Sequence, residues 1–146
     1  MIDYLEVRSF FQGYRHYDGK SKRGYLIFHK IEEFINRENI KIFYPKNLFI
    51  EDKELDIYIF LEGKILRVKG LGDNNIELKI LYFKDLKDFV CECIYEGGEY
   101  YHKLILKFNS DEIVFNKLED TNSSWGYKFE EQIKNIAKLL INANIT

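Results

Sequence analysis

The sequence predicts an α+β fold: a seven-stranded antiparallel, partly open barrel with a C-terminal amphipathic helix, preceded by two N-terminal helices. Three observations predict it. Apolar residues recur at helical spacing before residue 38, alternate with polar residues between 47 and 117, and return to helical spacing from Trp125. With 146 residues, 46% of them hydrophobic, we expect one domain, made of a helical elaboration (1–46) and a barrel with its helix (47–146).

Two helices are expected at the N-terminus. The stripe of the first is formed by Tyr4, Val7, Phe11 and Tyr14. The second is expected from Tyr25 to about Arg37, with Ser21 as a possible cap upstream. Its stripe is formed by Leu26, Ile27, Ile31, Phe34 and Ile35. The single proline, Pro45, is expected to interrupt the chain before the first strand.

Alternating segments separated by turn residues predict seven short strands. They are expected at 48–50, 55–61, 65–69, 76–82, 89–95, 100–108 and 112–117. Glycine- and asparagine-containing turns at 62–63, 72–75, 97–98 and 109–111 separate most of them.

Two hairpins have registers that can be tested for consistency. A two-residue turn at Gly97-Gly98 pairs Glu96 with Glu99 and therefore sets Cys93 opposite His102. A turn at 62–63 likewise gives one apolar face and, on the other, complementary charges. A slip of one residue would reverse both faces, so the side-chain pattern specifies both registers.

The C-terminal segment predicts a helix from about Trp125 to Ile141. Its apolar stripe is formed by Trp125, Phe129, Ile133, Ile136, Ala137 and Leu140. Ser123 or Ser124 is the expected cap. Adjacent carboxylates such as Glu130 and Glu131 are interpreted as a solvated helix face.

Seven short strands followed by one amphipathic helix resemble the pleckstrin-homology-like superfold. The segment Ile57-Tyr58-Ile59-Phe60-Leu61-Glu62-Gly63-Lys64-Ile65-Leu66-Arg67-Val68 is similar to the early hairpin of bacterial PH-like and GRAM-type domains. The resemblance covers roughly residues 47–142 and implies two nearly orthogonal sheets, with the last helix plugging one end. It also implies membership of a small bacterial family. The basic cluster of the lipid-binding members is not matched, because Arg67 and Lys69 face Tyr58 and Asp56 in the expected register.

Composition narrows the classes of function. A net charge of -2 predicts neither a nucleic-acid binder nor a polyanion. Residues 1–6 lack the pattern of a secretory signal, and no segment has the length of a membrane span. With only Cys91 and Cys93, we expect reduced thiols and a cytoplasmic location. Abundant Lys, Ile and Asn are typical of AT-rich bacterial or phage genes.

Three residues form the most reactive set that the sequence contains. The expected register puts Cys91, Cys93 and His102 on one sheet face, where they could bind zinc or form a nucleophile–base pair. Their neighbours on that face are apolar, and no orienting carboxylate is evident. We therefore interpret the three as core residues, and expect no enzyme, no metal and no cofactor.

Two further groups are candidate binding residues. The polar loop 15–23 carries Arg15, Lys20, Lys22 and Arg23, which could contact phosphate, although a solvated loop is the simpler interpretation. Tyr58 and Phe60, with Ile65, lie opposite the main apolar face of their hairpin. They form either an exposed patch or, as we favour, a surface covered by the N-terminal helices.

The leading hypothesis is a non-enzymatic binding or interaction module. Its ligand would be a protein or peptide, docked on a sheet edge or beside the C-terminal helix. A nucleic-acid or phosphate binder using the basic loop, and a thiol- or metal-dependent enzyme using Cys91, Cys93 and His102, are the alternatives. The sequence does not predict the ligand's identity or the oligomeric state.

Overall fold

The structure, a computed structural model, describes residues 1–143 and confirms the α+β class. The chain begins with α1 (Tyr4–Tyr14), α2 (Gly19–Phe34) and the 3-10 turn η1 (Arg37–Asn39). Seven strands follow, with the 3-10 turn η2 (Phe83–Asp85) between the fourth and fifth: β1 (Ile42–Lys46), β2 (Asp56–Leu61), β3 (Lys64–Gly72), β4 (Asn75–Tyr82), β5 (Asp88–Glu96), β6 (Glu99–Lys107) and β7 (Glu112–Asn116). The chain ends with the short α3 (Lys117–Asp120) and the long α4 (Gly126–Ile141).

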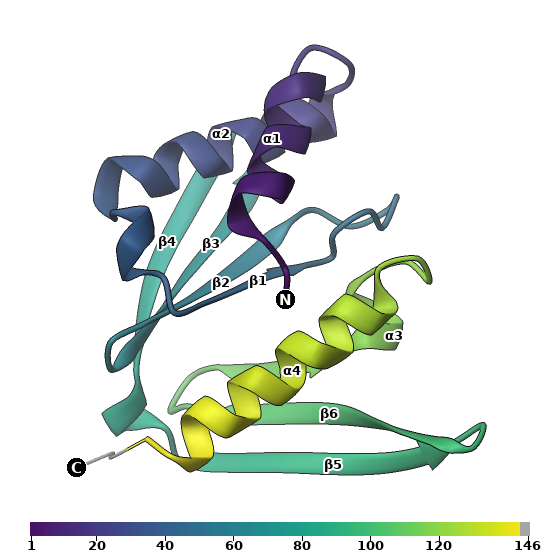
Figure 1. Ribbon diagram of the computed structural model, residues 1–146. Coiled ribbons are helices and arrows are strands. Elements are labelled where there is room, and N and C mark those ends of the chain that lie inside the picture. Colours follow the sequence, from purple (N-terminus) through teal and green to yellow (C-terminus); the bar gives the residue numbers. More distant parts are fainter. Residues whose placement is uncertain (144–146) are drawn as a thin grey trace.

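The strands form two antiparallel sheets, as Figure 1 shows. The first has the order β1-β2-β3-β4 and the second β5-β6-β7. Both predicted hairpin registers are confirmed, including Cys93 opposite His102 and Ile59 opposite Leu66. Within residues 1–143 no strand of one sheet pairs with a strand of the other, so the expected barrel is not confirmed.

The first strand is not where the sequence predicted it. Residues 48–50 form no strand, and β1 instead contains Pro45, opposite Ile57, before the expected division at 46/47. Proline is tolerated because β1 is an edge strand. The carbonyl of Phe43 points away from β2 and accepts a hydrogen bond from the side chain of Gln132. Alternate residues of a strand direct their backbone groups to the same side, so the nitrogen of Pro45 also points away from β2. Proline at this position therefore removes no hydrogen bond between β1 and β2.

The second helix begins earlier than predicted. Asp18 accepts a hydrogen bond from the backbone N–H of Ser21 at 2.7 Å, so α2 starts at Gly19 and includes half of the expected loop. Gly24 allows α1 and α2 to pack closely, since a Cβ there would lie 2.3 Å from the ring of Phe11. The helix ends at Phe34 rather than Arg37, and Phe34 is exposed.

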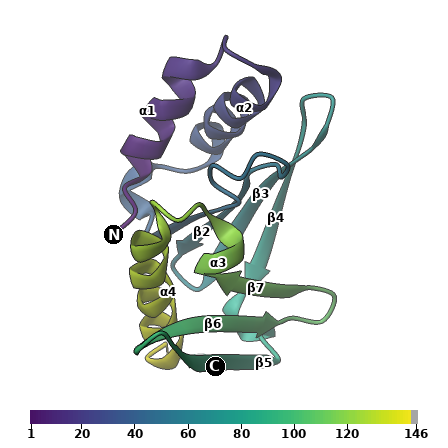
Figure 2. The ribbon, with the colours of Figure 1, turned by 90° about the vertical axis from the view of Figure 1, so that its right-hand side faces the viewer.

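The four-stranded sheet is the middle layer of the fold. On one face Phe43 packs against Tyr4 of α1, with ring centroids 5.1 Å apart. On the other face the ring of Tyr58 lies 5.0 Å from that of Phe115 in β7. Figure 2 shows α1 and α2 on the opposite side of the molecule from β5 and β6.

The positions of Tyr58, Phe60 and Ile65 correct one expectation. All three are buried, but the second sheet and not the N-terminal helices covers Tyr58 and Phe60, whose rings face Phe115. Both faces of β2 are apolar, and for this reason the pattern alone could not tell which layer covers which face.

The C-terminal helix carries the predicted stripe. Its buried apolar residues are Phe129, Ile133, Ile136, Ala137 and Leu140. The helix starts at Gly126, and the side chain of Asn122, instead of Ser123 or Ser124, accepts the N–H of Trp125 at 3.0 Å. Within residues 1–143, no helix combines the length and apolar character needed to cross a bilayer.

Candidate functional site

Lys20 and Arg23, two of the four candidate phosphate ligands, are engaged inside the chain. Lys20 donates to the backbone carbonyl oxygens of Ile50 and Glu51. Arg23 forms a bidentate ion pair with Glu54, whose Oε1 lies 2.5 Å from Nη2. These two cations therefore hold the loop after β1 against α2.

The other two basic residues do not converge with them. Arg15 donates to the carbonyl oxygen of Gln12 and lies 5.7 Å from the ring centroid of Tyr25, whereas Lys22 is exposed. The structure thus assembles no common anion site from the basic loop. Tyr58 and Phe60, the other predicted binding residues, lie in the core.

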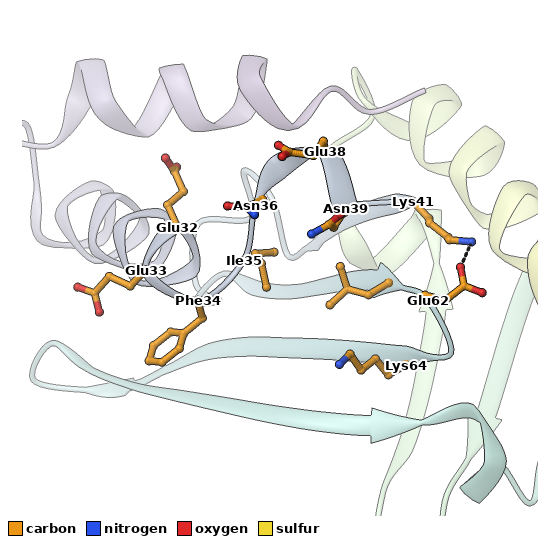
Figure 3. A pocket seen from close by; sticks show the side chains of 11 residues that line it. Glu32, Glu33, Phe34, Ile35, Asn36, Glu38, Asn39, Lys41, Glu62 and Lys64 are labelled. Carbon is orange, nitrogen blue, oxygen red and sulfur yellow. Dashed lines mark ion pairs between the residues drawn. The ribbon is translucent and has the colours of Figure 1, made fainter.

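A cleft of about 600 Å³ opens between the end of α2, η1 and the β2–β3 turn. Figure 3 shows that the side chains of Glu32, Glu33 and Phe34 leave the end of α2 in different directions. At the other end of the cleft, Lys41 forms an ion pair with Glu62.

Four of the six charged side chains that line this cleft are paired. Glu32 accepts from Arg8 at 2.5 Å, and Glu33 forms an ion pair with Lys30 at 3.0 Å. Three of its four carboxylates are paired, and Glu32 and Glu33 leave α2 in different directions. We therefore interpret the cleft as a surface hollow and not as a built site.

A second polar group lies within β6, directly next to the stretch that pairs with β7. Glu130 of α4 accepts the backbone N–H of His102 at 2.9 Å and contacts the ring Nδ1 of the same residue at 2.6 Å. Glu130 is only 9% exposed, so its interpretation as a solvated helix residue was wrong. It is the orienting carboxylate that the sequence did not reveal.

The hydrogen bond to Glu130 also defines the pairing of β5 with β6. Because the backbone N–H of His102 points toward Glu130 and away from β5, Cys93 and His102 form a non-hydrogen-bonded pair. Side chains approach most closely in such pairs. Cys93 is exposed and Cys91 is half-buried, and burial, followed by the proximity of Cys93, raises the pKa of the Cys91 thiol.

The metal interpretation of these residues finds no support. In the part of the chain that the structure describes, no three or more His, Cys, Asp or Glu side chains are arranged to hold a metal ion.

A buried polar cluster joins β1 to α3. Tyr44 donates to Oδ2 of Asp120 at 2.5 Å, and the same oxygen accepts the N–H of Asn116 at 2.9 Å. Lys46 Nζ lies 3.3 Å from the other carboxylate oxygen. Burial raises the pKa of Asp120, and burial together with Asp120 keeps the pKa of Tyr44 well above its ordinary value. This cluster is structural, since it lies inside the core.

The edge of β5 is the feature best suited to contact another molecule. β5 is a nine-residue strand that pairs only with β6 within residues 1–143. Its hairpin turn makes Glu96 and Glu99 a hydrogen-bonded pair, so every second residue from Asp88 to Glu96 bonds to β6. The intervening residues therefore point their N–H and C=O groups to the open side: Phe89, Cys91, Cys93 and Tyr95.

The solvent face of β5 alternates acidic and apolar side chains. Its five residues are Asp88, Val90, Glu92, Ile94 and Glu96. Three carboxylates without an intervening cation therefore follow one exposed strand edge. This alternation has the periodicity of a strand and can be seen in the sequence. The sequence does not show that this edge of the sheet is open.

The fold and this edge define an α+β protein with two antiparallel sheets and an accessible acidic edge strand. Residues 3–131 match the sequence family DUF3908, described as a "Protein of unknown function (DUF3908)". Because the match spans most of the 146 residues, the chain belongs to this family. Searches of curated proteins and of solved structures gave no match.

Proposed function

We propose that the protein is a non-enzymatic interaction module that binds an extended peptide segment of a partner protein along β5. The observation that carries this proposal is the open, nine-residue β5 edge with its outward N–H and C=O groups. A peptide that adds there as an eighth strand gains main-chain hydrogen bonds, while its alternate side chains provide specificity.

The existing partner of β5 indicates the chemistry of the peptide. On the solvent face, β6 sets Lys107 opposite Asp88, Ile105 opposite Val90 and Lys103 opposite Glu92. A strand on the open side of β5 meets the same acidic and apolar side chains. We infer that the ligand alternates basic and β-branched residues in the same way.

Charge also argues against a second copy of β5 as the occupant. Antiparallel self-pairing centred on Glu92 would set Asp88 opposite Glu96 and Glu92 opposite itself. Like charges directly opposite one another are destabilising, so a basic strand is the favoured ligand.

The first test is binding of a labelled peptide, Lys-Thr-Val-Thr-Lys-Thr-Ile-Thr-Lys, measured by fluorescence anisotropy. Glu92→Lys is expected to weaken binding about tenfold, because one attractive pair becomes repulsive. Glu112→Lys is the matched control: Glu112 also faces a lysine of β6, but from the β7 side. If both variants lose the same affinity for the peptide, the effect comes from net charge alone, and the proposal is contradicted.

A second arm of this test examines the backbone. Tyr95→Pro removes an N–H that faces the open edge and breaks no bond to β6, so the fold tolerates it. We expect it to weaken peptide binding at least about tenfold relative to Tyr95→Thr. If proline and threonine variants bind equally, the peptide does not pair with β5.

The scaffold proposed for this module is a pleckstrin-homology-like one. Four strands, then three strands, then a closing helix support it. Arg67, part of the basic cluster considered for lipid binding, is held by Asp56 at 2.8 Å and lies 5.3 Å from the ring centroid of Tyr58. This engagement favours a protein ligand over a phosphoinositide.

A further inference from the structure

A nucleophile, a base and an orienting carboxylate come together where β5 and β6 meet α4. Cys93 is exposed and lies directly across from His102 in a non-hydrogen-bonded pair. His102 is fixed in turn by Glu130, which accepts from its backbone nitrogen and contacts its ring at 2.6 Å. The register therefore sets one exposed thiol opposite a histidine whose ring is held by a carboxylate of α4.

The bond to Glu130 determines which ring nitrogen is available. A carboxylate accepts hydrogen bonds only, so the contact at Nδ1 requires a proton on Nδ1. In the neutral ring the lone pair is then on Nε2, which is the nitrogen able to take a proton. Glu130 is thus a positioning residue for His102, as the carboxylate is in other nucleophile–base pairs.

Cys91 supplies a second thiol on the same face of β5. Cys91 and Cys93 are alternate residues of β5, so their side chains point to the same face, and burial followed by the proximity of Cys93 raises the pKa of the Cys91 thiol. The thiolate is the reactive form of cysteine. Cys93, which is more exposed and faces His102, is therefore the first nucleophile and Cys91 the second.

We propose that Cys93 and Cys91 form a thiol–disulfide exchange site, with His102 as the base for Cys93. The Cys93 thiol gives its proton to His102, and its sulfur attacks a low-molecular-weight disulfide. This forms a mixed disulfide and releases one thiolate, which takes up the proton that His102 received. Cys91, after losing its proton to solvent, attacks the Cys93 sulfur and releases the second thiolate. The protein loses two electrons and two protons, and the small disulfide is reduced to two thiols.

The strand geometry makes the resulting protein disulfide a readily reducible one. Alternate residues of an extended strand have Cα atoms about 6.6 Å apart. This lies near the upper limit, about 6.8 Å, of the Cα separation in disulfides. The parallel side chains of alternate strand residues have Cβ atoms about as far apart as their Cα atoms, whereas a disulfide needs about 3.5–4.5 Å, so β5 must bend locally for the bond to close. Strain of this kind makes a disulfide easier to reduce. The site therefore suits reversible modification.

The experiment exposes the folded protein to oxidised glutathione and follows the intact mass. The wild type is expected to lose two hydrogen atoms as the Cys91–Cys93 disulfide forms, and Cys91→Ser to accumulate a mixed disulfide at Cys93. Cys93→Ser is expected to react at least about tenfold more slowly. A wild type that remains a mixed disulfide, or a Cys91 that reacts as fast as Cys93, would overturn the proposal.

The role of His102 is tested in the Cys91→Ser background. His102→Gln keeps a side-chain donor for Glu130 but cannot take a proton, and we expect it to slow mixed-disulfide formation about tenfold or more. His29→Gln, at an exposed position of α2, is the control and is expected to leave the rate unchanged. An unchanged rate in His102→Gln would remove the base from the mechanism. No peptide is present, so the outcome is independent of the proposed peptide binding.

Discussion

Two buried carboxylates show how the fold determines the role of a single residue by the hydrogen-bond donors that it places nearby. Asp120 and Glu130 are acidic and belong to helices, yet both are buried. Asp120 accepts a hydrogen bond from the hydroxyl of Tyr44, and Glu130 accepts one from the backbone N–H of His102. A buried acceptor that loses its donor costs more than the net value of one hydrogen bond, because its desolvation is no longer compensated.

Tyr44→Phe tests this at the residue scale. The variant leaves Oδ2 of Asp120 with only the N–H of Asn116, and we expect the free energy of unfolding to fall by about 1–3 kcal/mol. Tyr4→Phe is the control, since the Tyr4 hydroxyl donates to Glu32 nearer the surface, with an expected loss below about 1 kcal/mol. Urea unfolding measures both, and equal losses would show that burial of the acceptor is unimportant here.

At the scale of elements, strand edges are closed by side chains from other elements. Gln132 of α4 donates to Phe43 on the free edge of β1, and Lys46 donates to Val114 on the free edge of β7. Beyond the end of β7, Glu130 accepts the hydrogen bond from the backbone N–H of His102 in β6. The sequence predicted the hairpins because their turns and cross-strand charges specify register. It could not predict these closures, which depend on residues about 28 to 89 positions apart.

Glu130→Ala tests the closure of β6. It leaves the backbone N–H of His102 without its acceptor, and we expect a loss of about 1–3 kcal/mol of stability. Its neighbour Glu131 is exposed and, within residues 1–143, pairs only with the N-terminal ammonium group, so Glu131→Ala is expected to cost less than about 1 kcal/mol. Thermal or urea unfolding compares the two, and a smaller loss for Glu130→Ala than for Glu131→Ala would contradict this role.

At the scale of the whole molecule, the sequence predicted the element types but not the order of layers. β2 is apolar on both faces, so its alternation could not show that Tyr58 faces the second sheet while Phe43, on β1, faces α1. The shift of the first strand to β1 has a similar cause, because Pro45 is acceptable only where tertiary structure leaves one side of the strand unpaired. The alternation of acidic and apolar residues in β5 can be seen in the sequence, whereas its open edge depends on how the two sheets assemble.

Amide hydrogen exchange of β5, with and without the basic peptide, tests the central claim most directly. The amides of Phe89, Cys91, Cys93 and Tyr95 face the open edge, so the account predicts that they gain protection when the peptide binds. The alternate amides of Val90, Glu92 and Ile94 already bond to β6 and are expected to change little. Protection that appears around Lys41 and Glu62 in the cleft, with no alternation along β5, would contradict the account.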